Sequence, residues 1–198
     1  MLHAGADPGI GSDRVVTSRT ARRHGRLGRY RRRPVTLQSA GGGVSPDTWR
    51  ATIDRHVPDD VARLLATVSE WFGQPESNAE YVEAARTKET WTVRDQEGVV
   101  VGVTLVDRHF PHVAEIHLTV VDRAVHGTGV GSAMMSAIDQ DARARGVRLL
   151  EVKTLGASHP DAGYGRTRHF YEKWGFLPLE ETNLWGEGTP CLFMVKPL

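Results

Sequence analysis

Apolar residues recur every three to four positions between residues 47 and 86, which is the spacing of the buried face of a helix. They are Val57, Val61, Leu64, Leu65, Val68, Trp71 and Phe72. The glycine and proline of residues 73–75 interrupt the pattern, and it resumes over residues 78–86. Residues 45–47 offer a capping hydroxyl, a first-turn proline and an acidic side chain for the positive end of a helix. We therefore expect two or three helices over residues 47–86.

Beyond residue 90 the spacing of the apolar residues changes from four to two, and β-branched residues become frequent, as in strands. Strands are predicted at residues 90–94, 99–107 and 113–121, helices at 130–145 and 164–174, and later strands at 147–154, 176–179 and 192–195. The polar residues 95–98 suit a hairpin turn, and Gly146 suits the end of a helix. This order predicts one α/β domain, of the α+β kind, with a mixed sheet.

The composition is typical of a globular protein in water. Of the 198 residues, 39% are hydrophobic and 25% are charged. No run approaches the roughly 18 apolar residues of a membrane span, so no membrane is predicted as a partner. The single cysteine, Cys191, excludes a disulfide framework and a cysteine-based zinc site. The N-terminal region lacks the apolar stretch of a secretory signal, which predicts a cytoplasmic location.

The charge is distributed unevenly along the chain. Residues 1–34 hold nine arginines and two aspartates, a net charge of +7, so the remaining residues carry −6 of the formal +1. Residues 1–45 are poor in large apolar side chains, so we predict a disordered tail there and a folded domain over residues 46–198. The acidic domain favours a cationic acceptor, such as an amine, over a nucleic acid. Nucleic-acid binding by the arginines of the tail is the alternative, and it predicts that removal of residues 1–45 abolishes function.

A glycine-rich turn follows the third of these predicted strands and opens a predicted helix. Its residues 126–132 read His-Gly-Thr-Gly-Val-Gly-Ser. Closely spaced glycines let the backbone pass near a ligand, and the first amides of a helix point outward without partners. Together with the helix dipole, these amides make a seat for a pyrophosphate that needs no lysine.

Several classes of site use such a turn, and the spacing of the glycines separates them. A P-loop ends in Gly-Lys-Ser/Thr, whereas Ser132 follows the last glycine here. A dinucleotide-binding fold has the spacing G-x-G-x-x-G. Glu151 does lie about twenty residues further on, as a ribose-binding acid would, but too little chain follows for a doubly wound sheet. A turn with a purely structural role stays open at this point.

Two motifs carry a resemblance to a known family. Residues 126–131 resemble Gln/Arg-x-x-Gly-x-Gly/Ala, the acetyl-CoA pyrophosphate motif of the GNAT superfamily of N-acetyltransferases. Residues 170–176, Phe-Tyr-Glu-Lys-Trp-Gly-Phe, look like its second signature, Phe-Tyr-x-x-x-Gly-Phe. The resemblance covers residues 90–198. It implies a mixed, largely antiparallel central sheet flanked by helices, in which two cofactor-binding strands splay apart.

Two positions depart from the family's pattern. His126 stands where Gln or Arg is usual, although an imidazole can still donate a hydrogen bond to a phosphate. Tyr164 stands where Asn is frequent, six residues before the Phe-Tyr pair. Both residues favour the alternative function, a non-catalytic acyl-CoA-binding sensor or interaction module.

The resemblance implies direct transfer of an acetyl group from acetyl-CoA to a primary amine in a ternary complex, without a metal. Tyr171 is the candidate general acid for the leaving thiolate, because a phenol with a pKa of about 10 is protonated at pH 7. An amide near Val120 or Val121 is expected to polarise the thioester carbonyl. The residues expected to contact the cofactor are Val120, Val121, His126, Gly127, Thr128, Gly129, Val130, Gly131, Ser132 and Tyr164.

The strand before the glycine turn holds the candidates for the general base. Glu115, His117 and Thr119 are expected to alternate on one face of this strand, with its apolar residues on the other. A strand face that carries Glu and His and lies beside the cofactor differs from the apolar face of a strand in the core. Glu115 is the first candidate, directly or through water, and His117 is the second. A solvated strand edge is the structural alternative.

The remaining candidates have less specific patterns. His109 and His112 are predicted to lie in a solvent loop or in a loop that lines the acceptor site, since no third metal ligand is indicated. Four aromatic residues are predicted to pack in the core or, alternatively, to wall an acceptor pocket: Trp71, Phe72, Tyr81 and Trp91. The acceptor is expected to be a small molecule, because no peptide-binding insert is evident. A homodimer is expected on the resemblance alone.

Overall fold

The computed structural model describes residues 49–72, 74–161 and 163–198. The predicted tail and the helix start at residues 45–47 lie outside the described residues. In chain order the elements are β1 (Ala51–Asp54), α1 (Pro58–Thr67), α2 (Pro75–Ala84), β2 (Glu89–Arg94), β3 (Val100–Phe110), β4 (Val113–Val121), the 3-10 helix η2 (Arg123–Val125), α3 (Val130–Ala144), β5 (Leu149–Leu155), α4 (Tyr164–Lys173), β6 (Leu177–Thr182) and β7 (Cys191–Pro197).

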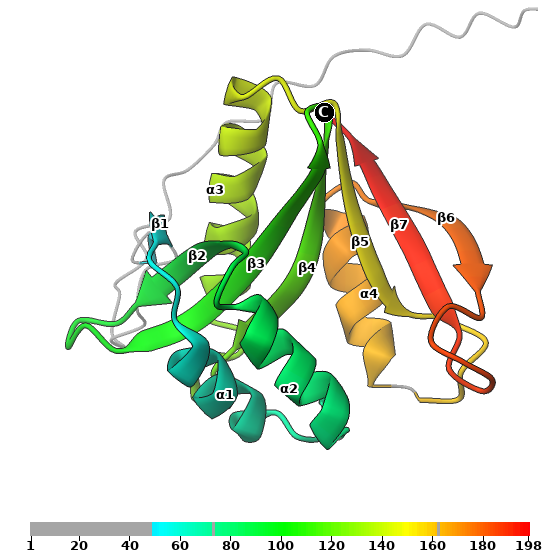
Figure 1. Cartoon of the computed structure of the whole chain (residues 1–198), viewed down its shortest axis with the longest axis horizontal. Coiled ribbons are helices and arrows are strands. Elements are labelled where there is room, and N and C mark those ends of the chain that lie inside the picture. Colours follow the sequence, from blue (N-terminus) through cyan, green and yellow to red (C-terminus); the bar gives the residue numbers. More distant parts are fainter. Residues whose placement is uncertain (1–48, 73, 162) are drawn as a thin grey trace, which may run out of the picture. The chain divides into compact units, whose positions relative to one another are not determined.

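One sheet organises the described part of the chain. Its seven strands follow the order β1-β2-β3-β4-β5-β7-β6 (Figure 1). All neighbouring strands pair antiparallel except β4 and β5, which pair in parallel through the connecting helix α3. The predicted fold class, a mixed and largely antiparallel sheet flanked by helices, is therefore confirmed.

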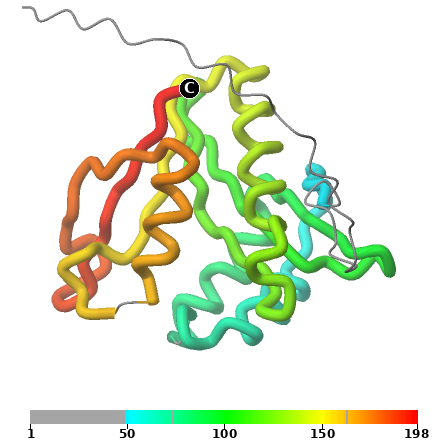
Figure 2. The backbone as a smooth tube through the Cα atoms, turned by 180° about the vertical axis from the view of Figure 1, so that it is seen from behind, coloured from blue at the N-terminus to red at the C-terminus, as the bar shows by residue number. Residues whose placement is uncertain are grey.

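Helices cover both faces of this sheet (Figures 1 and 2). On one face α1 packs Leu64 and Leu65 into a buried cluster with β3 and β4. On the other face α3 and α4 pack Met135, Ile138 and Tyr171 into a cluster with β4 and β5. Each large apolar side chain that is fully buried contributes about 1.5–3 kcal/mol relative to exposure, so the two clusters hold the helices onto the sheet.

The hairpin between β2 and β3 has the predicted turn. The Asp95 amide donates to the Val99 carbonyl oxygen at 2.9 Å, which closes residues 95–98 into a turn. Gly98 adopts a left-handed φ of +84°, a conformation that glycine reaches without steric cost. The turn chemistry seen in the sequence is thus confirmed.

Strand β1 overturns part of the helix prediction. Residues 51–54 were expected to belong to a helix, but they pair antiparallel with Thr90–Val93 at the edge of the sheet. The first helix of the described residues begins only at Pro58, with Asp59 and Asp60 in its first turn. A four-residue strand is too short to show a period of its own, and its pairing with β2 decides its conformation.

The parallel pair β4–β5 splays apart. Val113–Ile116 of β4 pair with Leu149–Val152 of β5, and no further pairing of these two strands occurs within the described residues. Strand β3, in contrast, pairs with β4 as far as Val121. The last five residues of β4 therefore have β3 on one side and no described β5 partner on the other, and the two ribbons diverge there (Figure 1). The predicted splayed strand pair is confirmed.

A bulge in β4 changes which side chains share a face. Leu118 pairs with Leu105 and Ile116 with Val106, so His117 has no partner on β3. One extra residue reverses the alternation of the side chains beyond it. Ile116 accordingly joins the cluster under α3 and α4, whereas Leu118 joins the cluster under α1.

The bulge also corrects the predicted alternation of Glu115, His117 and Thr119 on one face. The Thr119 hydroxyl lies 3.2 Å from that of Thr104, which contacts the Met134 sulfur of α3 at 3.3 Å. Thr119 therefore faces α3. Glu115 alternates with the inward-facing Ile116 and points to the opposite face.

Candidate functional site

A groove of about 710 Å³ lies beside the last part of β4, where the described residues of β5 no longer pair with this strand. Four segments line it: the end of α1 and the residues after it, the last part of β4, the glycine turn, and α4. The lining residues are Val68, Trp71, Phe72, Thr119, Val120, Val121, Val125, His126, Gly127, Gly129, Val130, Gly131, Ser132, Tyr164, Arg166, Thr167, Phe170 and Tyr171. All the residues predicted to contact the cofactor lie along this groove except Thr128.

The glycine turn owes its shape to two left-handed glycines. Gly127 has a φ of +78° and Gly129 a φ of +103°, values that an L side chain rarely adopts. Gly129 is the N-cap of α3, and its carbonyl oxygen accepts the first helical hydrogen bond, from Ala133, at 2.9 Å. The amides of residues 130–132 belong to the first turn of this helix, so they have no acceptor within it and lie at the end of the groove. This end of the groove can seat an anion.

The other two predicted residues of the turn make local contacts. Thr128 donates its hydroxyl to the Val125 carbonyl oxygen at 2.8 Å and accepts from the Trp49 indole at 3.0 Å. His126 places Nε2 at 2.9 Å from the Val121 carbonyl oxygen, which makes Nε2 the donor nitrogen. The His126 ring therefore stands along the groove wall and ties the turn to the end of β4.

Tyr171 lies on the floor of the groove. It is buried, with only 5% of its surface exposed, and its ring contacts those of Phe170 and Phe176 edge-on at 5.4 Å between centroids. Burial raises the pKa of Tyr171 to about 12, against the opposing effect of the nearby Thr119 hydroxyl. The phenol is therefore protonated at neutral pH and can act as a donor.

Glu115 lies among basic side chains where β4 and β5 begin to separate. Its carboxylate is 2.7 Å from Nε2 of His109, 2.9 Å from Nζ of Lys153 and 3.6 Å from Nδ1 of His117. His117, followed by His109 and Lys153, holds the pKa of Glu115 well below its usual range despite burial. Glu115 is thus an ionised carboxylate and a weak proton acceptor.

The sequence did not reveal two members of this cluster. His109 was expected in a loop, but it lies near the end of β3, half-exposed. Lys153 forms a second ion pair with Glu151 at 2.9 Å, and its ammonium lies 5.3 Å from the centre of the Phe193 ring. Glu115 and Glu151 are register partners in the parallel pair, and this register cannot be inferred before the pairing of the strands is known.

The four aromatic candidates separate into two groups. Trp71 and Phe72 line the groove. Tyr81 of α2 contacts the rings of Phe72 and His117, with centroids 5.8 and 5.7 Å away. Trp91, in contrast, is buried in the cluster under α3. Two of the four thus line the groove, Tyr81 packs beside Phe72, and Trp91 is a core residue.

No group of three His, Cys, Asp or Glu side chains in the described part of the chain could hold a metal ion. No helix among residues 49–72, 74–161 and 163–198 combines the length and apolar character needed to cross a bilayer.

Comparison with protein families gave one match. The sequence model of the acetyltransferase (GNAT) family matches residues 59–176, which include the glycine turn, both splayed strands and α4. The comparison with curated proteins gave no match.

Solved structures share the fold at low sequence identity. Ard1 from Thermoplasma volcanium is 20% identical with a TM-score of 0.61, covering 75% of this chain and 97% of its own. A GNAT family acetyltransferase from Elizabethkingia anophelis with acetyl-CoA bound is 16% identical with a TM-score of 0.58. The match covers 77% of this chain and 99% of that protein. An aminoglycoside 6'-N-acetyltransferase complexed with coenzyme A is 20% identical with a TM-score of 0.59. The match covers 74% of this chain and 96% of that protein.

Proposed function

We propose that this chain, which belongs to the acetyltransferase (GNAT) family, transfers an acetyl group from acetyl-CoA to a primary amine in a ternary complex. One observation carries the proposal: the groove between the end of β4 and α4 has an anion seat at one end and a protonated phenol, Tyr171, on its floor. In this proposal acetyl-CoA is a co-substrate whose pyrophosphate binds to the amides of residues 130–132. A solved structure of the same fold has acetyl-CoA bound, and another is a complex with coenzyme A.

In this mechanism, backbone amides at the end of β4 that does not pair with β5 polarise the thioester carbonyl. Beyond Ile116 the strand has no β5 partner within the described residues, so backbone amides there can bind the pantetheine arm and the thioester carbonyl. The amide near Val120 or Val121 remains our candidate for stabilising the oxyanion. Tyr171 then donates to the sulfur as the carbon–sulfur bond breaks.

The protons of the reaction balance through two side chains. An acceptor ammonium carries three protons, of which one stays on the amide nitrogen. A second ends on the coenzyme A sulfur through Tyr171. The third must leave to a base before the amine can attack. Direct transfer therefore needs one proton acceptor on the acceptor side of the groove.

We assign this proton to His117, with Glu115 in support. The lowered pKa of Glu115 makes it a weak base, but its carboxylate lies 3.6 Å from Nδ1 of His117, where it can orient the imidazole. Glu115 acting through a water molecule is the alternative. These two assignments of the general base can be distinguished by experiment, because only the first requires the imidazole of His117.

The acceptor in this proposal is a small amine. The residues after position 34 carry a net charge of −6, which attracts cations. An aminoglycoside 6'-N-acetyltransferase with the same fold modifies a small molecule by its name. A cytoplasmic location, a homodimer and the disordered tail of residues 1–45 remain predictions from the sequence.

The second candidate function is a non-catalytic acyl-CoA-binding module. It is favoured by the two departures from the family's pattern, since His126 bonds the Val121 carbonyl oxygen and Tyr164 bonds that of Trp71. Nε2 of His126 and the hydroxyl of Tyr164 are thus engaged with the backbone and not turned toward a cofactor.

Release of coenzyme A thiol separates the two functions. We expect thiol release from acetyl-CoA with at least one member of a panel of polyamines, aminoglycosides and amino acids. Tyr171→Phe should slow it by about 10²-fold or more while acetyl-CoA still binds. Tight binding of acetyl-CoA without thiol release for any amine would favour the binding module.

A further inference from the structure

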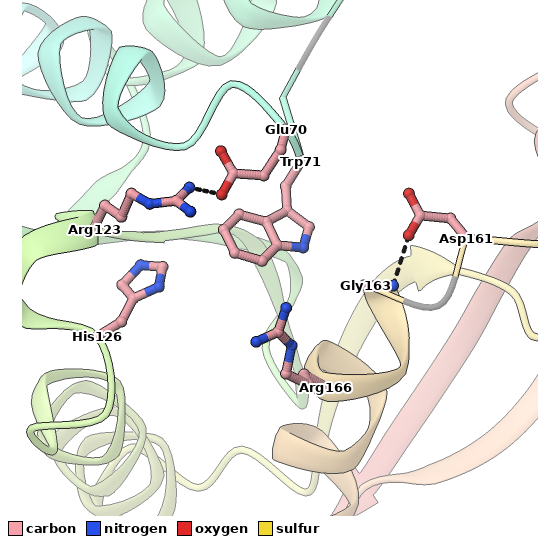
Figure 3. Close-up of a pocket in the computed structure, with 7 residues that line it drawn as sticks. All are labelled: Glu70, Trp71, Arg123, His126, Asp161, Gly163 and Arg166. Atoms are coloured by element: carbon pink, nitrogen blue, oxygen red, sulfur yellow. Dashed lines mark hydrogen bonds and ion pairs between the residues drawn. The ribbon is translucent and has the colours of Figure 1, made fainter.

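Two residues that follow α1 line a cavity that shares part of its wall with the groove. Glu70 and Trp71, which we call the strap, contact the β4–α3 side of the groove and also α4 on the other side (Figure 3). The catalytic proposal gives these contacts no role. They join segments that lie on either side of the space into which the cofactor must fit.

The first anchor of the strap lies at the end of β4. Arg123 forms an ion pair with Glu70. The Arg123 guanidinium carbon is 6.0 Å from the centre of the Trp71 ring, and the His126 ring is 5.7 Å from it. A cation and an imidazole at these distances hold the indole beside the glycine turn (Figure 3).

The second anchor is the first turn of α4. The Tyr164 hydroxyl donates to the Trp71 carbonyl oxygen at 2.6 Å, across 93 positions of the sequence. The Arg166 guanidinium carbon lies 5.8 Å from the centre of the Trp71 ring. Tyr164, whose position is frequently Asn in the family, therefore holds the strap against α4.

Arg166 brings a positive charge to the cavity around the strap, and this charge has no ion pair among residues 49–72, 74–161 and 163–198. The cavity measures about 670 Å³ and shares Trp71, His126 and Arg166 with the groove. Glu70 is neutralised by Arg123, and the Asp161 carboxylate accepts the Gly163 amide at 2.6 Å. No carboxylate lies within 4.0 Å of the Arg166 guanidinium in the part of the chain that the structure describes. An anionic group that reaches the glycine turn therefore meets Arg166 and the indole together.

We propose that the strap closes over the phosphate-bearing arm of acyl-CoA, and that the Tyr164–Trp71 contact retains the cofactor in the groove. This inference rests on the proposed function, since it takes acyl-CoA as the ligand. Cofactor release then requires the strap to leave α4. Tyr164 acts through Trp71 and is a positioning residue.

The dissociation rate of acetyl-CoA measures this retention. Surface plasmon resonance on the immobilised full chain gives the association and dissociation rates separately. Tyr164→Phe removes the hydrogen bond that joins the strap to α4, so we expect dissociation about 2–10-fold faster. Trp71→Ala removes the indole as well and should show a larger increase.

Matched variants separate retention from loss of stability. Thr90→Val also removes a hydroxyl that donates to a backbone carbonyl, that of Lys88 at 3.0 Å, but on β2. Arg123→Ala breaks an exposed Arg–Glu pair at the strap, and Arg86→Ala breaks a similar pair with Glu83, near the end of α2. We expect faster dissociation for Arg123→Ala and wild-type rates for both control variants.

The outcomes that overturn the proposal differ from failure of the proposed function. Equal dissociation rates for wild type, Tyr164→Phe and Trp71→Ala would show that the strap does not retain the cofactor. Faster association and tighter binding in Tyr164→Phe would show that the strap obstructs the groove. If acetyl-CoA bound to no protein, including the folded wild type, the proposed function itself would fail.

Discussion

The substitution Glu115→Gln tests the charged cluster where β4 and β5 separate. Glutamine has nearly the same shape but no charge, and its amide nitrogen would face His109 or Lys153. The variant loses charge-assisted hydrogen bonds to His109 at 2.7 Å and to Lys153 at 2.9 Å. Such bonds contribute about 1.5–3 kcal/mol each when both partners are buried.

Two features of the cluster make the expected loss of stability smaller than the sum of these two hydrogen bonds. His109 is half-exposed, and Lys153 keeps its second ion pair, with Glu151. We therefore expect Glu115→Gln to lower the free energy of unfolding by about 2–3 kcal/mol in total at pH 7. For a domain of this size the midpoint of thermal unfolding should fall by about 4–12 °C.

The pH dependence identifies the charge as the cause. The folded-state pKa of Glu115 is lowered, so its stabilisation is fully present above the unfolded carboxyl pKa of about 4.3 and is lost as the pH falls toward the folded value. Below pH 4.3 the difference between wild type and variant should shrink by about 1.4 kcal/mol per pH unit. The groups that face this carboxylate are His109, His117 and Lys153.

Circular dichroism during heating at pH 7 and at pH 3 measures both effects. Glu180→Gln is the matched control, because Glu180 is exposed on β6 and has no ion pair among the described residues. It should change the midpoint by less than about 2 °C. An unchanged midpoint for Glu115→Gln at pH 7, or the same difference at both pH values, would refute this reasoning.

Two further predictions concern the base and the core. His117→Gln should lower kcat for an amine substrate by about 10²-fold, leave the KM for acetyl-CoA unchanged, and make the residual rate rise with pH as the amine loses its proton in solution; an unchanged kcat would assign the base to Glu115. Phe176→Ala should cost about 3–5 kcal/mol in chemical denaturation, because the ring is buried under the sheet, whereas Leu177→Ala, 60% exposed, should change stability by less than about 0.5 kcal/mol. Similar losses for both variants would contradict the assignment of the core.

Local patterns predicted most of the fold. The change of period near residue 90 placed the strands and α3 and α4 correctly, because most of these elements have one face in a buried cluster. Strand β6 is the exception, since its residues are almost all exposed. The glycines of the turn were informative, because Gly127 and Gly129 adopt left-handed conformations that other residues avoid. Strand β1 escaped prediction, because its conformation depends on pairing with β2.

The candidate site was only partly predictable, because much of it depends on register. The bulge at His117 is visible only in the pairing of β3 with β4, so the sequence placed Thr119 on the wrong face. The contacts of Glu115 with Lys153 and His109 depend on two neighbouring strands. Motif spacing identifies residues that act through their own backbone, but it does not reveal side chains that the sheet brings together.

Calorimetric titration with acetyl-CoA tests the central claim most directly. We expect the wild-type protein to bind acetyl-CoA but not NADH or ATP. Gly129→Glu should abolish binding, since it forces a charged side chain into a left-handed position at the anion seat. Gly186→Glu, at a similar φ of +94° in the β6–β7 loop, should bind as wild type does. Absence of acetyl-CoA binding in the folded wild-type protein, or equal binding by both variants, would contradict the account.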